Sequence, residues 1–322
     1  MRKSKLCMLT LGLLACILMT TAVQARIWYV PSQVETVDKA ISVARSGDVI
    51  EIAVGVHKIA GYGHRLTPGV TIRSDCGMPG GVVLQESSSQ FGRWRDGPVF
   101  ILDPSLSPAN SVVIENITFK NFTDTFGPNA IGPEPIFNIL GGILTMTNCE
   151  FDTYYGTAVK FDGGSGEFTN CDFTNGNANP VALYFAGDKL TLTDCNFTEN
   201  SYQHSNVWPG KAQRTPGAII RLESGELYCN NSQFMENGPL TYLVDVAQGA
   251  LMHACTSCLV GNRTIWEGRV SGTVQLDCCS ATPAKWLVMP GGSFITVENG
   301  LLGNPLSVEN TSLTRVKSLF NQ

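Results

Sequence analysis

The chain has 322 residues, of which 43% are hydrophobic and 33 are glycine, and its formal net charge is −5. This acidic balance argues against nucleic acid as a partner, because binding to phosphates needs clustered Lys and Arg side chains. It also predicts repulsion from polyanions unless a cation or a local basic patch intervenes. The glycine and apolar content is typical of a turn-rich β protein with a continuous core.

The N-terminus has the pattern of a secretory signal peptide. Three basic residues within the first five positions precede an apolar run from Leu6 to Val23, and the small-residue sequence Val23-Gln24-Ala25 offers a cleavage site. We expect removal of residues 1–25, which brings the formal net charge to −8, and a secreted, periplasmic or cell-envelope protein. The alternatives are an uncleaved anchor and a lipoprotein attached through Cys16. No later apolar run is long enough to span a bilayer.

A helix is predicted directly after this segment. Ser32 and Glu35 have the spacing of a capping box, an apolar stripe follows at helical spacing, and Gly47 suits the end of the helix. Gly47-Asp48 then leads into an alternating strand that begins at Val49. We expect a helix over residues 32–46 that covers one end of the β structure, where apolar core and strand edges would otherwise be exposed.

Near-copies of one phrase recur between Pro135 and Asn200. In each copy apolar and Thr residues alternate, an Asn or Asp follows, and then Cys and Phe fall two positions apart. The aligned residues Phe151, Phe173 and Phe197 are 22 and 24 positions apart, a period that indicates stacked repeat units. The alternation predicts strands with one buried face, and Asn or Asp suits a sharp bend between them. We therefore predict about ten coils of a parallel β-solenoid.

Two columns of equivalent residues follow from aligning the phrases. The bend column is Asn116, Asn148, Asn170, Asp194 and Asn231, whose side chains could hydrogen-bond along the stack and satisfy polar groups that face inward. Cys149, Cys171 and Cys195 form an inward column, which we interpret as a buried stack of small apolar groups in poor geometry for disulfides. Of the remaining cysteines, Cys255 with Cys258 and Cys278 with Cys279 are the pairs to test for disulfides. No complete set of metal ligands is visible.

The repeat and the opening segment together resemble the right-handed parallel β-helix of the pectin-lyase-like superfamily. The resemblance implies an all-β, single-domain solenoid over residues 26–310, which we expect to be monomeric. Leu313, Val316, Leu319 and Phe320 fall at helical spacing, so residues 311–322 are expected to form a tail with a short capping helix. In active relatives the polysaccharide groove lies along one sheet beside long loops. Three long connections are expected here, from Glu86 to Pro98, from Asn121 to Pro135 and from Ser201 to Gly217.

The alignment points to one outward column on the sheet that precedes the repeated phrase. Lys160, Tyr184, Arg221 and Asp245 should form it, with Asn138 at its near end. Asp162 and Glu223 come two positions after Lys160 and Arg221, one step further along the same sheet. Lys160, Asp162, Arg221, Glu223 and Asp245 are catalytic candidates by position alone, because the hydrolase, lyase and methylesterase signatures of the superfamily are missing. A lyase would also need carboxylates that hold calcium, and otherwise we expect no cofactor.

Sugar binding is the other chemistry that this face could perform. Tyr184, Trp94 and Trp208 offer flat apolar surfaces, and Arg93, His204 and Arg214 could hold an acidic chain. The leading hypothesis is a noncatalytic secreted or envelope protein whose loop-lined face binds carbohydrate or a surface partner. The alternatives are a lyase or glycoside hydrolase that acts on an acidic polysaccharide, and a structural or adhesin-like rod whose face is merely solvated.

Overall fold

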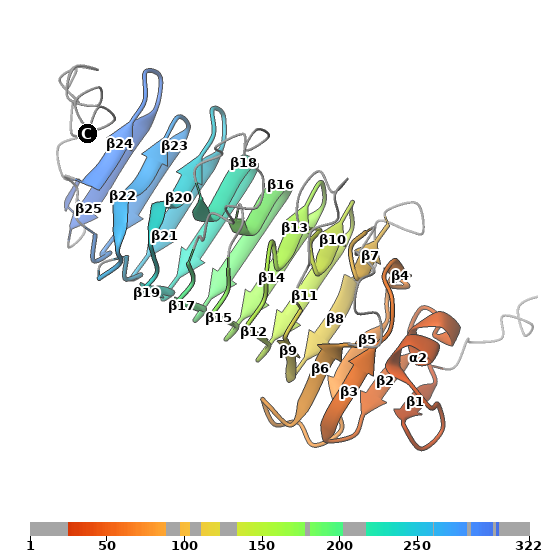
Figure 1. Cartoon of the computed structure of the whole chain (residues 1–322). Helices are drawn as coiled ribbons and strands as arrows, with labels where there is room; N and C mark the ends of the chain where they lie inside the picture. Colours follow the sequence, from red (N-terminus) through yellow and green to blue (C-terminus); the bar gives the residue numbers. More distant parts are fainter. Residues whose placement is uncertain are drawn as a thin grey trace, which may run out of the picture.

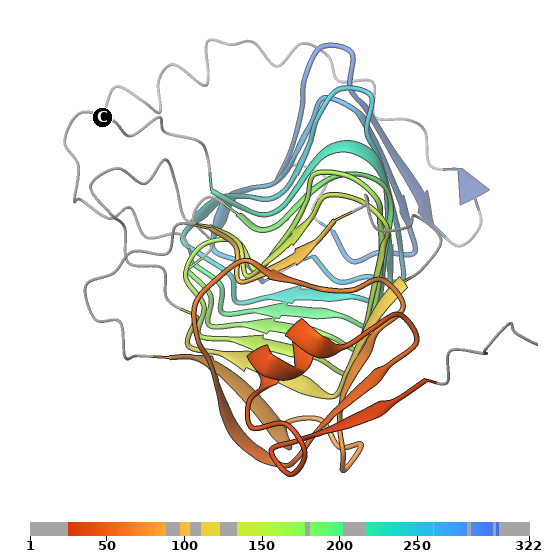
Figure 2. The same ribbon diagram turned by 90° about the vertical axis from the view of Figure 1, so that its right-hand side faces the viewer.

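The structure is a computed structural model that describes residues 25–87, 97–103, 111–122, 134–177, 181–201, 217–259, 261–281, 285–298 and 301–302. The chain winds into a stack of coils that advances steadily from the N-terminus (Figure 1). Viewed nearly along the stack, the successive coils superimpose on one another (Figure 2). The expected signal peptide, the tail of residues 311–322 and most of the three long connections lie outside the described residues.

Three ladders of parallel strands form the sides of the stack, named here face 1, face 2 and face 3. Face 1 consists of β4 (His64–Arg65), β7 (Phe100–Leu102), β10 (Phe137–Ile139), β13 (Val159–Phe161), β16 (Val181–Thr193), β18 (Ala218–Asn230), β20 (Leu240–Val246), β22 (Thr264–Val270) and β24 (Trp286–Val288). Face 3 consists of β3 (Gly55–Ile59), β6 (Val82–Glu86), β9 (Ile117–Lys120), β12 (Glu150–Asp152), β15 (Asp172–Thr174), β17 (Asn196–Thr198) and β19 (Gln233–Met235).

Face 2 shares two long strands with face 1, because β16 and β18 each continue from one face into the other. Its remaining members are β1 (Ile27–Val30), β2 (Val49–Ile52), β5 (Thr71–Ser74), β8 (Ser111–Glu115), β11 (Ile143–Thr147), β14 (Ser165–Thr169), β21 (Leu251–Cys255), β23 (Thr273–Asp277) and β25 (Ser293–Glu298). The short strand β26 (Leu301–Leu302) pairs antiparallel with β25. The all-β parallel fold predicted from the repeat is therefore the observed fold.

The phenylalanines of the repeated phrase form one stack inside the solenoid. Their rings follow one another at centroid distances of 5.0, 4.8, 4.6 and 4.8 Å, in the order Phe119, Phe151, Phe173, Phe197 and Phe234. The planes of the last three rings are within 4° of parallel. Each ring is buried, so every coil places the same large apolar group on the one below it.

The three cysteines of the phrase also lie inside, one on each coil. Their thiols donate to backbone carbonyl oxygens of the preceding coil, for example from Cys171 Sγ to Met146 O at 3.6 Å. A hydrogen bond with the Cys171 thiol, together with burial, raises the pKa of Cys195, so this thiol stays protonated. The nine cysteines among the described residues are all free, including the two pairs that the sequence offered for disulfides.

The bend column forms a hydrogen-bonded ladder, but it does not face inward as predicted. Asn148 Nδ2 donates to Asn116 Oδ1 at 3.0 Å, and Asn170 Nδ2 donates to Asn148 Oδ1 at 2.8 Å. Each bend residue has a left-handed backbone, and the side chains lie at an outer corner, half-buried or exposed. The interior position belongs to the next residue, because the left-handed bend turns the Asn side chain outward. Since a carboxylate has no donor, Asp194 cannot donate to the preceding coil, although it accepts from Asn231.

A second ladder of amides, absent from the sequence prediction, lies inside the stack. Asn200 and Asn237 are fully buried, and the Nδ2 atom of each donates to Oδ1 of the next Asn, with Asn262 at the end of the series. Each Nδ2 also donates at 2.7 Å to a backbone carbonyl oxygen of the preceding coil. The backbone N–H groups of Asn200 and Asn237 donate to the same Oδ1 atoms, so these buried amides are well satisfied.

Tyr154 connects this amide ladder to the aromatic part of the core. Its hydroxyl donates to Asn200 Oδ1 at 2.8 Å, and the intervening coil has Gly176 at the equivalent position. A Cβ atom on Gly176 would lie 2.2 Å from Tyr154 Cζ, so only glycine leaves room for the ring. The ring therefore crosses one whole coil to reach its hydrogen-bond partner.

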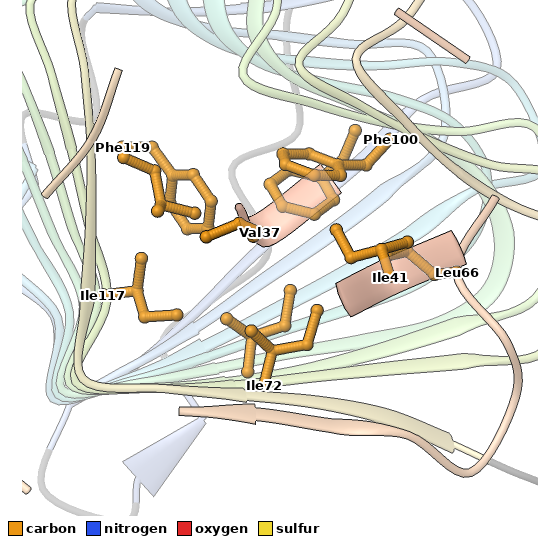
Figure 3. A pocket seen from close by; sticks show the side chains of 10 residues that line it. Val37, Ile41, Leu66, Ile72, Phe100, Ile117 and Phe119 are labelled. Atoms are coloured by element: carbon orange, nitrogen blue, oxygen red, sulfur yellow. The ribbon is translucent and has the colours of Figure 1, made fainter. Parts of the chain in front are cut away.

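The helix α2 (Val37–Val43) lies across the first coils, but it is shorter than the predicted 32–46. Its N-cap is Thr36, whose Oγ1 accepts from Lys39 N at 3.3 Å, and not Ser32 with Glu35. The helix cannot extend back past Thr36 because the backbone of that residue is extended, with φ −135° and ψ 157°. The N–H groups of residues 33 and 34 instead donate to Tyr29 O, in a turn after β1. Val37 and Ile41 face a small hollow that is lined only by apolar side chains (Figure 3). The other lining residues include Leu66, Ile72, Phe100, Ile117 and Phe119.

We predict that Asn237→Ala lowers the free energy of unfolding by about 3 kcal/mol or more, since it leaves several buried polar groups without a partner. Those groups are the Asn200 N–H and the Phe197 carbonyl oxygen. Chemical denaturation followed by circular dichroism measures the change. Asn196→Ala is the matched control, because the Asn196 side chain bonds Asp172 on the outside of face 3. Equal losses for the two variants would contradict the assigned role of the inner ladder.

A second prediction concerns the space next to Tyr154. Gly176→Ala should lower the melting temperature, because the added methyl overlaps the buried ring and the tightly packed coils leave little room to move. Gly97→Ala is the control, since a Cβ there would meet only Tyr62 Cδ2 at an ordinary 3.5 Å. Differential scanning calorimetry of both variants tests the prediction, and an unchanged melting temperature for Gly176→Ala would refute it.

Candidate functional site

Face 1 carries a continuous outward column built by the strand register. Paired strands place Asn138, Lys160, Tyr184, Arg221, Asp245, Arg269 and Leu287 one above another in that order. The residues on either side of Tyr184, Leu183 and Phe185, belong to the interior core. Alternation along each strand therefore turns this column to the outside.

Each cation of the column has a carboxylate partner on the same face. Lys160 Nζ lies 2.7 Å from Asp162 Oδ2, and Arg221 Nε donates to Glu223 Oε2 at 2.9 Å. These two pairs join residues two positions apart on one strand, and their side chains are between 30% and 40% exposed. Exposed pairs of this kind add little to stability, and they leave oxygen and N–H groups facing solvent.

Asp245 differs from the sequence prediction, which treated it as an exposed catalytic candidate. It is only 3% exposed, because the Arg269 guanidinium on the next coil covers it. Arg269 Nε and Nη2 donate to the two carboxylate oxygens at 2.7 and 2.6 Å, a bidentate arrangement. The hydrogen bond with Asp245 raises the pKa of Arg269 further above its ordinary value, so the guanidinium stays charged.

Beside the column lies a strip of apolar and aromatic side chains on the outside of the solenoid, named here the outer strip. It is separate from the interior core, and it consists of Val181, Tyr184, Ala218, Tyr242, Trp266 and Leu287. Val181, Ala218 and Tyr242 are buried, whereas the other three are partly exposed. The strip runs from β16 through β18, β20 and β22 to β24, so it follows the axis of the stack.

Cations lie over two tyrosine rings of the outer strip. Lys160 Nζ is 5.7 Å from the centroid of the Tyr184 ring, and Arg269 Cζ is 5.4 Å from that of Tyr242. Burial, and then the negative charge of Glu223, raise the pKa of Tyr184, while burial raises that of Tyr242. Both phenols are therefore neutral at physiological pH and can donate as well as accept hydrogen bonds.

Sequence reasoning found only part of this surface. It missed Tyr242, Trp266, Arg269 and Leu287, although Arg269 follows Asp245 by 24 positions, the same spacing that separates Tyr184 from Lys160. Extending the column by one more coil would have found it. The predicted binding residues Arg93, Trp94, His204, Trp208 and Arg214 lie outside the described residues.

Within the part of the chain that the structure describes, no group of three His, Cys, Asp or Glu side chains is arranged to hold a metal ion. No helix there is long and apolar enough to cross a membrane.

Comparison with known proteins identifies similar folds. Residues 136–282 match the family described as the right-handed beta helix region, whereas no curated protein sequence matches. The pectate lyase Pel9A superimposes with a TM-score of 0.53 at 12% identity, over 87% of this chain and 79% of that chain. A pectin methylesterase from Aspergillus niger gives a TM-score of 0.47 at 13% identity, over 86% of this chain and 85% of its own.

A third similar structure is a glycan biofilm modifying enzyme of Pantoea stewartii, whose fold is a tailspike-like parallel β-helix. It has a TM-score of 0.34 at 10% identity, over 82% of this chain and 38% of that one. At such identities the likeness concerns the fold alone. The parallel ladders, the match over residues 136–282 and the superposition on the pectate lyase agree with one another. In its fold, the chain is therefore a right-handed parallel β-helix, similar to that of the pectate lyase.

Proposed function

We propose that this protein is exported and binds a polysaccharide along face 1 without cleaving it. The observation that carries the proposal is the outer strip together with the ion pairs beside it. The partly exposed members of the strip, Tyr184, Trp266 and Leu287, offer apolar surfaces to the C–H faces of sugar rings. The ion pairs offer hydrogen-bond donors and acceptors to hydroxyl groups. Binding sites for small molecules commonly combine these two elements.

The arrangement favours an extended, repetitive ligand over a compact one. The strip crosses five consecutive strands of face 1, and neighbouring strands are about 4.8 Å apart. An extended polysaccharide that lies along the stack would contact a ring or an ion pair on each coil. A compact ligand would cover only one or two coils and leave the rest of the strip unused.

The pairing of the carboxylates supports a binding role over a catalytic one. Glycoside hydrolysis usually needs two carboxyl groups with separate acid and base roles, and a lyase needs a basic side chain that is free to accept a proton. Asp162, Glu223 and Asp245 are each bound to a cation, and so are Lys160, Arg221 and Arg269. Every residue that the sequence offered as a catalytic candidate is therefore engaged in an ion pair.

Incubation of the purified protein with a panel of neutral and acidic polysaccharides, with and without calcium, tests the proposal. Retention of the protein on a polysaccharide, without release of shorter products, is the expected result. Release of shorter products, if Asp245→Ala or Lys160→Ala abolishes it, would instead support a lyase or glycoside hydrolase. If the protein is neither retained on any polysaccharide nor releases products from one, the remaining hypothesis is a structural rod.

Tyr184→Ala is expected to weaken polysaccharide binding about fivefold, because stacking of one ring contributes about 1 kcal/mol. Affinity electrophoresis or isothermal titration measures the change. Tyr228→Ala is the matched control, since Tyr228 is a half-buried tyrosine on face 2, away from the outer strip. Circular dichroism of both variants separates lost binding from lost fold, and equal binding of the two folded variants would contradict the site.

A further inference from the structure

The cations of the face 1 column are already neutralised by side chains of the protein itself. Lys160, Arg221 and Arg269 are paired with Asp162, Glu223 and Asp245 respectively. Further along the same ladder Arg65, at the register position of the column, pairs with Asp103. Among the described residues, each positive charge in the column thus has a negative charge in direct contact, and the four cations and their four carboxylate partners together have no net charge.

An acidic ligand would meet these carboxylates at short range. Opening an exposed ion pair costs about 1 kcal/mol at most, so Lys160 or Arg221 could turn toward a ligand carboxylate. The carboxylate left behind would remain beside that ligand group, and like charges a few ångströms apart repel. The overall negative charge of the chain adds to this repulsion over longer distances.

Arg269 is the least available of these cations. It holds the buried Asp245 in a bidentate pair, and turning the guanidinium toward a ligand would leave that carboxylate buried without a partner. Removing one partner of a buried pair is strongly destabilising. Arg269 can instead keep Asp245 and offer its remaining N–H groups to hydroxyl oxygens, since a guanidinium has five donors.

We infer that the polysaccharide bound by face 1 is uncharged, with ring faces packed on the outer strip and hydroxyl groups bonded to the paired charges. This inference rests on the proposed function and adds the chemical class of the ligand. It is an alternative to the expectation from the sequence that basic side chains on this side would hold an acidic chain. An ion pair suits a hydroxyl group because it presents a strong donor and a strong acceptor side by side.

The first test uses polysaccharides that share a backbone and differ in charge. Polygalacturonate is compared with its fully methyl-esterified form, and carboxymethylcellulose with hydroxyethylcellulose. We expect the full chain to bind a neutral member at least about tenfold more tightly than its acidic partner, with an affinity that changes less than about twofold between low and high NaCl. Preference for an acidic member, with affinity falling as salt rises, would overturn the inference and leave the binding role intact. Binding to no member of either pair would overturn both.

The second test exposes the cations. The double variant Asp162→Asn, Glu223→Gln removes the partners of Lys160 and Arg221, and it should gain at least about tenfold in affinity for polygalacturonate, in a salt-sensitive manner. The control Glu167→Gln, Asp172→Asn makes the same change in net charge on faces 2 and 3, and it should leave that affinity unchanged. Equal gains in both double variants, or no gain in either, would show that the paired carboxylates do not exclude acidic ligands.

Discussion

The parallel register between successive coils is the constraint on which the rest of this structure depends. Each strand bonds the equivalent strand of the next coil, so a residue and its counterpart one coil later lie at the spacing of a β-ladder. Every side chain is thereby placed against a copy of its own position. A favourable contact between like groups is then repeated along the stack, and an unfavourable one is repeated as well.

This constraint explains both the interior and the outer surface. Inside, it stacks phenylalanine on phenylalanine and amide on amide, and it lets thiols donate to the carbonyl oxygens of the coil below. In the face 1 column, no charged side chain is stacked on one of the same sign, because like charges at this spacing repel. The face 1 column alternates instead, with a tyrosine between Lys160 and Arg221 and a carboxylate between Arg221 and Arg269. The neutral face is in this sense a result of the register.

The repeated phrase carried enough information to predict the fold and the direction of the outward column. The Phe and Cys positions recur at nearly constant spacing, so alignment alone indicates which residues share a side of the coil. It could not show that Asp245 is covered, because burial depends on Arg269, a residue in a stretch where the phrase has faded. The inner amide ladder was missed although Asn200, Asn237 and Asn262 each follow the Phe position of their coil by three residues, because the two preceding coils have Tyr154 and Gly176 at that position, so no amide repeat stands out there. The predicted helix cap was wrong because the backbone stays extended as far as Thr36, which caps the helix in place of Ser32.

The contact between Tyr154 and Asn200 also bears on how such a chain could change length in evolution. On one side of Gly176 the inner position is aromatic, and on the other it is an amide, so this glycine marks a boundary between two kinds of stacking. Duplication of a coil within the Asn200–Asn262 stretch would set one amide on another and preserve every bond. Deletion of the coil that contains Gly176 would drive the tyrosine ring into the side chain it now reaches only with its hydroxyl. The structure therefore favours gain of a whole coil on the amide side of Gly176 and disfavours loss of the coil that contains this glycine.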